Sequence, residues 1–196
     1  RAGAHDERGD DVGGPEELKA VLPTLRTPRL RLRAIGIEDV IELYGVFSDP
    51  EVVRYWSRPA LSDLAEAVLM IEQRAEQPSL LQWGIVRADE DLLIGTCTLA
   101  DIDLAHRRAS IGYALARAAW GQGIAREAVR ALIKYGFEAI ELHRIAADVD
   151  PRNARSIHLL EELGFSREGL QREYYFVGDE WQDTAMFGLL RREWAG

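Results

Sequence analysis

Cysteine is almost absent from this sequence. Cys97 is the single cysteine among 196 residues, so no disulfide can form within the chain. It lies in the apolar run LLIGTCTLA, which favours a buried, inert thiol over a nucleophile. Because disulfides accumulate in oxidising compartments, we expect a protein of the reducing cytoplasm.

Long apolar runs and a surplus of basic residues are also missing. No segment approaches the roughly 20 apolar residues that span a bilayer, and the N-terminus has no apolar signal core, so we expect no membrane partner. The 24 Lys and Arg against 33 Asp and Glu give a net charge of −9. Since binding to a phosphate backbone requires a basic face, nucleic acid is not an expected partner either. The histidines have no carboxylate or cysteine at ligand spacing, so no metal site is predicted.

The length and the 47% of hydrophobic residues indicate one globular domain with a proper core. Residues 1–22 differ from the rest, because they are rich in glycine and acids and have almost no large apolar side chains. We therefore expect a flexible acidic tail over 1–22 and a folded domain over 23–196.

The first half of the domain shows strand and helix periodicities. Leucines that alternate with arginines at 29–34 predict a strand. The segment 36–49 predicts a helix with one apolar stripe, and 62–77 predicts a second helix capped by Ser62. Short polar connections then separate three strand-like runs, which predicts an antiparallel meander. The stripe comprises Ile37, Val40, Ile41, Tyr44 and Phe47, and the strand-like runs are 80–88, 92–101 and 107–116.

The second half alternates helices and strands. Apolar residues at helical spacing from 125 to 137 predict an amphipathic helix, which a short strand at 144–150 follows. Residues 153–165 predict another helix that ends at Gly164, and 172–190 predict a closing hairpin. This order of elements predicts an α+β (mixed α/β) domain.

One motif, AAWGQGIAREAV at 118–129, places two glycines at the start of a helix. A helix start has unpartnered N–H groups and a partial positive charge, and glycines let the backbone approach a ligand closely. Such a loop can bind phosphates through its backbone alone, although a tight turn without a ligand would show the same glycines. It matches neither a Walker loop nor a dinucleotide loop, because the Lys-Ser/Thr of the former and the third glycine of the latter are missing.

A second motif, VDPRNARSIHLLEELGF, follows about 30 residues later. Asn153 and Ser156 stand three residues apart at the start of a helix. Both types are good helix caps, and either could instead turn its polar group towards a ligand.

Together the two motifs resemble the GNAT superfamily of N-acetyltransferases, in particular its RimJ/RimL branch, which acetylates the α-amino groups of ribosomal proteins. The resemblance extends over 25–191. It implies a largely antiparallel sheet of seven strands with about four helices on its faces, splayed between the fourth and fifth strands. Ala118 departs from the family pattern, which has Gln or Arg at that position.

The resemblance implies acetyl-CoA as donor and a direct attack by a primary amine in a ternary complex. It places the pyrophosphate on the backbone of the glycine loop and the pantetheine arm along the fourth strand as an added strand. Ser156 would stabilise the leaving thiolate. The residues expected to bind acetyl-CoA are Tyr113, Ala114, Leu115, Trp120, Gly121, Gln122, Gly123, Ile124, Ala125, Asn153 and Ser156.

The general base and the acceptor stay open. Tyr175 is expected to donate a proton or to line the acceptor pocket, and a water chain could replace a dedicated base. Further candidates for proton transfer are Asp101, Asp103, Glu168, Tyr174, His106 and His143. Aromatic residues that could form core or acceptor wall are Tyr55, Trp56, Trp83 and Trp181.

The acceptor is expected to be a protein N-terminal α-amine or a small amine. A catalytically silent acyl-CoA-binding module is the alternative, because no base is evident. The resemblance also allows a homodimer, for which the sequence carries no coiled-coil or repeat signal.

Overall fold

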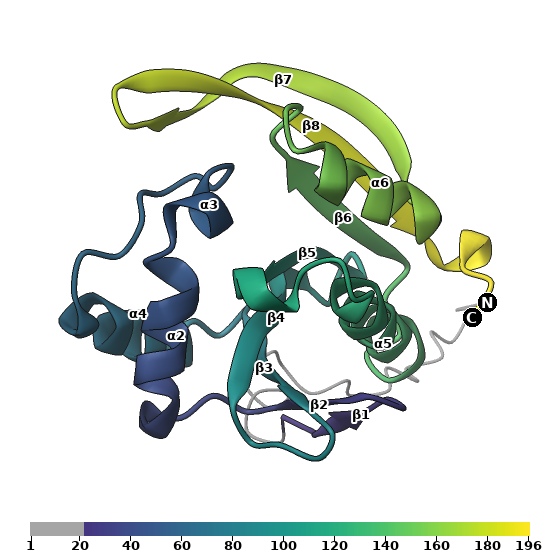
Figure 1. The fold of residues 1–196 in the computed structure, drawn as a ribbon. Coiled ribbons are helices and arrows are strands. Elements are labelled where there is room, and N and C mark those ends of the chain that lie inside the picture. Colours follow the sequence, from purple (N-terminus) through teal and green to yellow (C-terminus); the bar gives the residue numbers. More distant parts are fainter. Residues whose placement is uncertain (1–21) are drawn as a thin grey trace, which may run out of the picture.

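The computed structural model describes residues 22–196. One eight-stranded sheet runs through this part of the chain in the order β1-β2-β3-β4-β5-β6-β8-β7 (Figure 1). All neighbouring strands are antiparallel except β5 and β6. The strands are β1 (Leu25–Arg26), β2 (Leu30–Arg33), β3 (Leu81–Arg87), β4 (Leu93–Asp103), β5 (Arg108–Leu115), β6 (Arg144–Val149), β7 (Ser166–Val177) and β8 (Glu180–Leu190).

This sheet confirms the predicted α+β class and the antiparallel meander β3–β4–β5. It has eight strands where seven were expected, since the two residues of β1 pair with Arg31 and Leu32 of β2. The strand β7 begins at Ser166, earlier than the predicted 172. Residues 166–171, which were not predicted as strand, are all exposed and mostly polar, so no apolar alternation marks this part, and pairing with β8 defines it. The expected tail over 1–22 lies outside the described residues, apart from Leu22.

Five α-helices occur in the described part of the chain, against about four expected. The extra one, α3, is a single turn that begins at Pro50. Three 3₁₀ turns accompany the helices, namely η1 (Ile37–Asp39), η2 (Arg117–Ala119) and η3 (Arg191–Glu193). The α-helices are α2 (Val40–Phe47), α3 (Pro50–Val53), α4 (Leu64–Glu76), α5 (Ile124–Glu138) and α6 (Ala154–Glu162).

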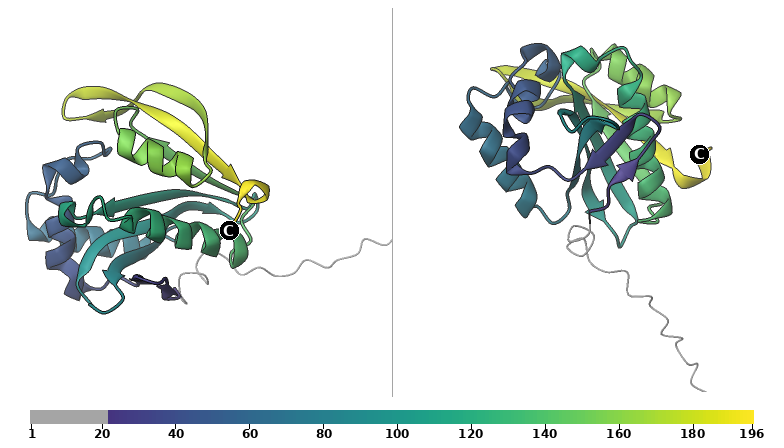
Figure 2. Two further views of the ribbon diagram at one scale, coloured as in Figure 1. Left: turned by 45° about the vertical axis from the view of Figure 1, so that its right-hand side comes forward. Right: turned by 60° about the horizontal axis from the view of Figure 1, so that its bottom comes forward.

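The helices cover the two faces of the sheet. Cys97 and Leu99 of β4 point to the face that α5 covers, whereas Val86 of β3 and Ala114 of β5 belong to the core beneath α2 and α4. Figure 2 shows α2 and α4 in blue and α5 in green on opposite sides of the strands. Cys97 is fully buried, as predicted, and burial raises the pKa of its thiol well above the usual range.

Two predictions for the first helices are wrong in detail. The helix predicted over 36–49 is η1 followed by α2, and Ile37 and Ile41 of its expected stripe are 58% and 68% exposed. The cap of α4 is Asp63, whose side chain accepts a hydrogen bond from the backbone N–H of Glu66 at 3.0 Å. The Ser62 hydroxyl instead donates to the Glu66 carboxylate. Asp63, one residue after Ser62, is better placed to accept from the first N–H groups of the helix.

The strands β5 and β6 part as predicted. Their parallel pairing runs from Arg108–Arg144 to Ser110–Ala146 and ends there. The remainder of β5 stays paired with β4, while the remainder of β6 stays paired with β8 (Figure 1). The sheet therefore opens on the side where α5 and α6 begin. Within residues 22–196, no helix is long and apolar enough to cross a bilayer.

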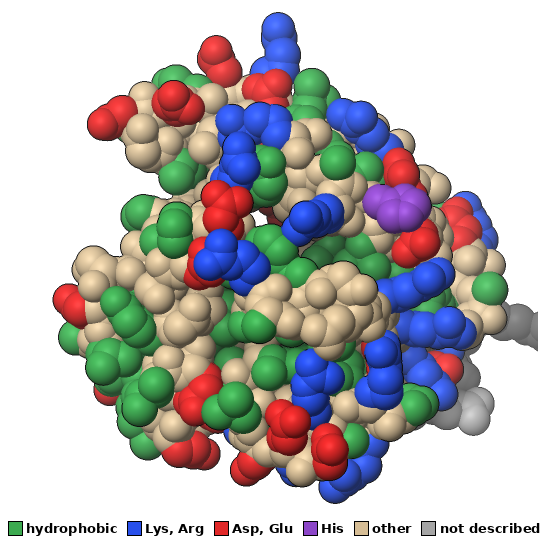
Figure 3. Space-filling model, in the orientation of Figure 1, with side chains coloured by type: hydrophobic (Ala, Val, Ile, Leu, Met, Phe, Trp, Pro, Cys, Tyr) green, Lys and Arg blue, Asp and Glu red, His purple; other side chains and the backbone are tan. Residues whose placement is uncertain are grey.

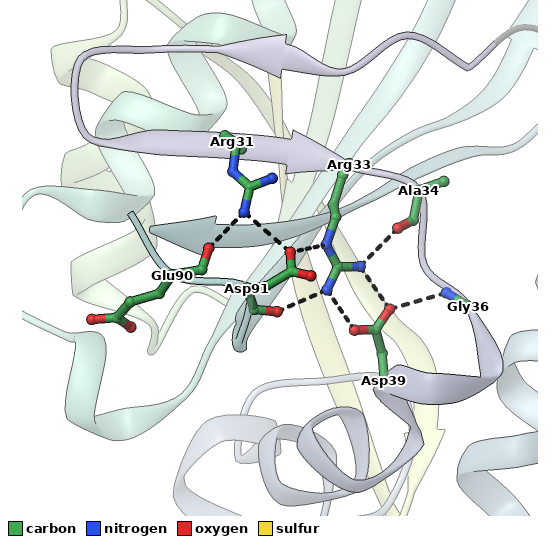
Figure 4. Close-up of polar contacts among 7 residues, drawn as sticks. All are labelled: Arg31, Arg33, Ala34, Gly36, Asp39, Glu90 and Asp91. Carbon is green, nitrogen blue, oxygen red and sulfur yellow. Dashed lines mark hydrogen bonds and ion pairs between the residues drawn. The ribbon is translucent and has the colours of Figure 1, made fainter. Parts of the chain in front are cut away.

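An ion pair fixes the start of α2 against the sheet (Figure 4). Arg33 at the end of β2 donates two hydrogen bonds to Asp39, at 2.7 and 2.8 Å, and two more to the carboxylate and the carbonyl of Asp91 in the β3–β4 connection. Asp39 is 3% exposed and also accepts from the backbone N–H of Gly36 at 3.0 Å. Burial by itself would raise the pKa of Asp39, but the hydrogen bonds from Arg33 and Gly36 outweigh it and lower that pKa.

We predict that Asp39→Asn lowers the free energy of unfolding by about 2 to 4 kcal/mol at pH 7, because it leaves the Arg33 guanidinium without its buried partner. A carboxylate with a lowered pKa stabilises the fold above its unfolded pKa, and this contribution is lost as pH falls through the folded pKa. The difference between wild type and variant should therefore shrink below about pH 4. Urea denaturation across pH measures it.

Asp91→Asn is the matched control, since Asp91 bonds the same arginine from an exposed position. It should cost less than about 1 kcal/mol. Equal losses in the two variants would contradict the assignment of the stabilising contact to Asp39.

Candidate functional site

The glycine loop between β5 and α5 has the backbone that the sequence predicted. Gly121 and Gly123 both have φ of +73°, a left-handed conformation that side chains with a Cβ rarely adopt. Gly123 is the N-cap of α5, a helix of 15 residues. Its N–H groups and positive dipole end therefore open onto this loop, as an anion site requires.

Side chains from elsewhere hold the loop in place. The Gln122 amide donates to the Ala118 carbonyl at 2.8 Å and accepts from Arg87 at 2.9 Å. Arg29 donates to the Gln122 carbonyl at 2.9 Å and pairs with Glu127 in the first turn of α5. Gln122 thus anchors the loop through its side chain. Sequence reasoning missed Arg29 and Arg87, because only the tertiary fold brings their strands to this loop.

Trp120 connects the loop to both β5 and α6. Its indole N–H donates to the Leu115 carbonyl at 2.8 Å, and the Arg155 guanidinium lies 5.1 Å from the centre of its ring. The Leu115 carbonyl is therefore already engaged at the end of β5.

Asn153 and Ser156 have different tasks. The Asn153 side chain caps α6 by accepting from the Ser156 backbone N–H at 3.2 Å. The Ser156 hydroxyl instead lies 2.5 Å from the Tyr113 hydroxyl of β5. Burial raises the pKa of Tyr113 to about 12, even though the contact with Ser156 acts the other way. Tyr113 thus keeps its proton at neutral pH, next to a serine that does not serve as the helix cap.

Tyr175 lies among carboxylates where β5 and β6 part. Its hydroxyl donates to Asp148 of β6 at 2.8 Å. Burial raises the pKa of Tyr175 well above the usual range, and the negative charges of Asp148 and Asp101 add to the effect. Asp101 has φ of +51° at an irregularity of β4 and accepts from the Ser110 hydroxyl at 2.7 Å. Sequence reasoning missed Asp148, for which the available signal was an acid within the mostly apolar strand RIAADV.

Other proton-transfer candidates are held in surface ion pairs. Asp103 accepts from the backbone N–H and contacts Nδ1 of His106, and it also pairs with Arg108. Glu168 lies within β7 and pairs with Arg144. These contacts lower the pKa of both carboxyls, which makes them poor bases. No cluster of three or more His, Cys, Asp or Glu that could hold a metal occurs among residues 22–196.

A cavity of about 360 Å³ opens between α4 and the adjacent face of β4 and β5. Small side chains of β4 and Gly112 of β5 form its floor, and Trp56 forms part of its wall while its ring also packs edge-on against Phe47. Trp83, by contrast, is core, and Trp181 is exposed. The cavity is lined by Trp56, Arg58, Met70, Gln73, Arg74, Gln77, Leu80, Thr96, Thr98, Ala100, Gly112 and Tyr113.

Figure 3 shows the molecule hollowed between α3 and the β7–β8 side, with charged residues of both signs at the rim.

Comparison with known proteins identifies the family. A model of the acetyltransferase (GNAT) domain matches residues 29–166. An uncharacterized N-acetyltransferase, p20 of Bacillus licheniformis, is 42% identical over 89% of this chain and 100% of its own length. The [ribosomal protein uS5]-alanine N-acetyltransferase of Escherichia coli (strain K12) is 29% identical over 87% of this chain and 92% of its own. The crystal structure of spermidine N-acetyltransferase from Vibrio cholerae in complex with CoA and spermine superposes with a TM-score of 0.78 at 25% identity, over 87% of this chain and 100% of the other.

We predict that Asp148→Asn lowers the pKa of Tyr175, because the substitution removes the nearest negative charge that opposes ionisation of the phenol. Titration of a protein labelled with ¹³C at the tyrosine Cζ atoms measures this pKa. Asp183→Asn, on the neighbouring β8, is the control and should leave it unchanged. An unchanged Tyr175 pKa in Asp148→Asn would contradict the contact.

Proposed function

This chain belongs to the GNAT family of N-acetyltransferases, and on that premise we propose that it moves an acetyl group from acetyl-CoA to a primary amine by direct attack in a ternary complex. The observation that carries the proposal is the opening between β5 and β6, with the glycine loop at one end and the Tyr113–Ser156 pair beside it. Relatives are named for an alanine of ribosomal protein uS5 and for spermidine. We also propose a cytoplasmic location, which the lone, disulfide-free thiol of Cys97 supports.

The chain's residues fit the phosphates of acetyl-CoA. Backbone N–H groups from Gly121 to Ala125 would hold the pyrophosphate, supported by two left-handed glycines and the start of α5. Arg29 and Arg87 add positive charge beside this loop. Trp120, Gln122 and Ile124 would shape the loop.

The open edge of β5 fits the pantetheine arm. Backbone groups of Tyr113 and Ala114 lie in the part of β5 that β6 does not pair with, so they can add an extended chain as a further strand. Leu115 would offer the pantetheine arm fewer hydrogen bonds than expected, because its carbonyl already accepts from the Trp120 indole N–H. Asn153 would act by fixing the start of α6, which positions Ser156.

Ser156 would donate a hydrogen bond to the thiolate as it leaves. We assign Tyr113 as the donor in the Tyr113–Ser156 contact, since a phenolic O–H is a stronger hydrogen-bond donor than an aliphatic hydroxyl. Ser156 then accepts from Tyr113 and has its own proton available for the sulphur. In the reaction the amine nitrogen bonds the acetyl carbon and the carbon–sulphur bond breaks. Of the two protons that the ammonium loses, one goes to the thiolate and one to solvent.

Tyr175 and Asp148 would handle the amine. Tyr175 keeps its phenolic proton at neutral pH, so it suits positioning or proton donation rather than service as a base. Asp148, which accepts from Tyr175, is the member of the pair that can take a proton from the amine, directly or through water.

Binding and turnover together test the function. Thermal unfolding should shift upward with acetyl-CoA and stay unchanged with ATP or NAD, since a ligand at 100 times its Kd stabilises by about 2.7 kcal/mol. Thiol release with N-terminal peptides and small amines then tests for transfer. Binding without thiol release from any amine would favour the silent acyl-CoA-binding module. No shift at millimolar acetyl-CoA would overturn both the transferase and the binding module.

We predict that Ser156→Ala lowers kcat about 10- to 100-fold, the size of one hydrogen bond to a developing charge. The KM for acetyl-CoA should change little, because the bond forms fully only as the thiolate departs. Thiol-release kinetics measure both constants. Ser166→Ala, an exposed serine on β7, is the control, and a Ser156→Ala enzyme with the kcat of wild type would show that this hydroxyl is not catalytic.

We predict that Gly123→Ala weakens acetyl-CoA binding about tenfold, because a Cβ at φ +73° displaces the N–H groups of the loop. Gly178→Ala places the same strain at φ +57° in the β7–β8 turn and should cost similar stability without affecting the affinity. Calorimetric titration with acetyl-CoA compares the two. If the two variants bound acetyl-CoA with equal affinity, the glycine loop would not be part of the donor site.

A further inference from the structure

Tyr55 forms a contact between the segment after α3 and the other half of the sheet. Its ring is half-buried, and the Cζ atoms of two guanidinium groups lie near the ring centre, that of Arg54 at 5.4 Å and that of Arg152 at 6.0 Å. Arg54 is its neighbour in the chain, whereas Arg152 belongs to the corner between β6 and α6. The second contact therefore joins parts of the chain that lie on the two sides of the opening between β5 and β6.

The Arg152 guanidinium is firmly held on its side of the opening. Its Nε and Nη2 donate to the Asp150 carboxylate at 2.6 to 3.1 Å, and its backbone N–H donates to the same carboxylate at 2.8 Å. Asp150 is only 7% exposed, so the pair is anchored just beyond the end of β6. The hydrogen bonds to Asp150, and also the charges of Asp150 and Glu180, raise the pKa of Arg152. Arg152 thus offers the Tyr55 ring an oriented and permanently charged partner.

The segment that carries Tyr55 is anchored on the opposite side. Val53 is buried in the core beneath α2 and α4, and the Trp56 ring packs edge-on against Phe47 with 5.0 Å between the ring centres. Trp56 and Arg58 also line the cavity of about 360 Å³ beside α4. Tyr55 therefore stands at the rim of this cavity, directly before a residue of its wall.

The bridge between Tyr55 and Arg152 lies close to the residues proposed to handle the amine. Arg152 follows Asp148 of β6 by four residues, and the charge of Glu180 acts on it from the β7–β8 hairpin that also carries Tyr175. Figure 3 shows the hollow between α3 and the β7–β8 side. Tyr55 comes from the first side of this hollow and Arg152 from the half of the sheet that contains β7 and β8. An amine that enters through the hollow has to pass beside the bridge.

We propose that Tyr55 is a specificity-determining residue for the acceptor, because its ring and the Arg152 guanidinium bridge the entrance that the amine uses. This rests on the proposed acetyl transfer and adds to it a preference among acceptors. An unbranched chain can pass beside the two groups, whereas a branched chain or a peptide has to displace the ring. The favoured acceptor is therefore a primary amine on a slender chain, ahead of a protein N-terminus.

The strength of the contact determines the size of this preference. A cation–π contact at an exposed site shifts an equilibrium by about two- to fivefold. The bridge can therefore open during turnover, so that it selects among acceptors without excluding one outright. Because the face of the ring carries the contact, the Tyr55 hydroxyl is not needed for it.

Competition between isomeric amines measures the preference. Pentylamine and neopentylamine have the same composition, and when both are present the ratio of acetylated products gives the ratio of their kcat/KM values. We expect Tyr55→Ala to shift this ratio towards neopentylamine by about two- to fivefold, and Tyr55→Phe to keep the wild-type ratio. The intrinsic reactivity of each amine is the same with every variant and cancels. A wild-type ratio in Tyr55→Ala overturns the proposal.

A second residue tests whether the bridge acts as a unit. Arg152→Gln removes the charge from the Tyr55 ring and should shift the ratio as Tyr55→Ala does, and the double variant should show no additional shift. Arg54→Gln is the matched control, because Arg54 contacts the same ring but belongs to the same side of the hollow. An equal shift in Arg54→Gln, or single effects that multiply in the double variant, overturns the bridge. Tyr55→Ala and Arg54→Gln decide by themselves if Arg152→Gln does not fold.

A peptide tests the acceptor class. A tetrapeptide that begins with alanine competes with pentylamine for acetyl transfer. We expect the wild type to prefer pentylamine, and Tyr55→Ala to reduce this preference by about two- to fivefold. A wild-type enzyme that prefers the tetrapeptide overturns the slender acceptor.

An NMR measurement detects the bridge without turnover. The Arg152 Nε–H, which Asp150 holds in place, lies near the Tyr55 ring, and Arg152→Gln identifies its resonance. Tyr55→Ala should move this resonance through loss of the ring current, whereas Tyr55→Phe should leave it nearly unchanged. Transfer to none of these acceptors would overturn the proposed function and the preference together, even if the resonance moves. A moved resonance with acetyl transfer but an unchanged product ratio would overturn the preference alone.

Discussion

Three residue pairs join β5 to β6, and the whole site depends on the point where this pairing ends. A strand edge inside a sheet normally finds a neighbouring strand, so an unpaired edge beyond Ser110 and Ala146 needs other partners. The antiparallel neighbours β4 and β8 hold the two strands from their outer sides. The opening can therefore exist without loss of the sheet, and it exposes β5 to a ligand that adds backbone hydrogen bonds.

Basic and acidic residues lie at opposite ends of this opening, although the net charge of the chain is −9. Arg29 and Arg87 meet at the glycine loop, while Asp101 and Asp148 lie near Tyr175 at the other end. Anionic phosphates and a protonated amine thus have separate favourable places. The carboxylates raise the pKa of Tyr175, so the same charges that would attract an amine also keep the phenol protonated.

Arginine serves two purposes in this fold. Arg33 binds Asp39 in a closely matched pair that connects β2 to the start of α2, and its role is structural. Arg29 and Arg87 instead hold the glycine loop in place through Gln122. The first arrangement stabilises the start of α2, and the second fixes the loop at the start of α5.

The sequence by itself determined the class of fold, the glycine loop and the helix that Asn153 caps, because these follow from local periodicity, from φ angles that only glycine tolerates, and from capping chemistry within one turn. It left the role of Ser156 open, since the partner of its hydroxyl, Tyr113, lies 43 residues away. The contact of Asp148 with Tyr175 and that of Arg29 and Arg87 with the glycine loop could not be predicted, because strand register and helix packing decide which distant side chains meet. Periodicity, turns and helix caps depend on neighbouring residues and can be predicted from the sequence, whereas the acceptor site forms only where separate elements meet in the tertiary structure.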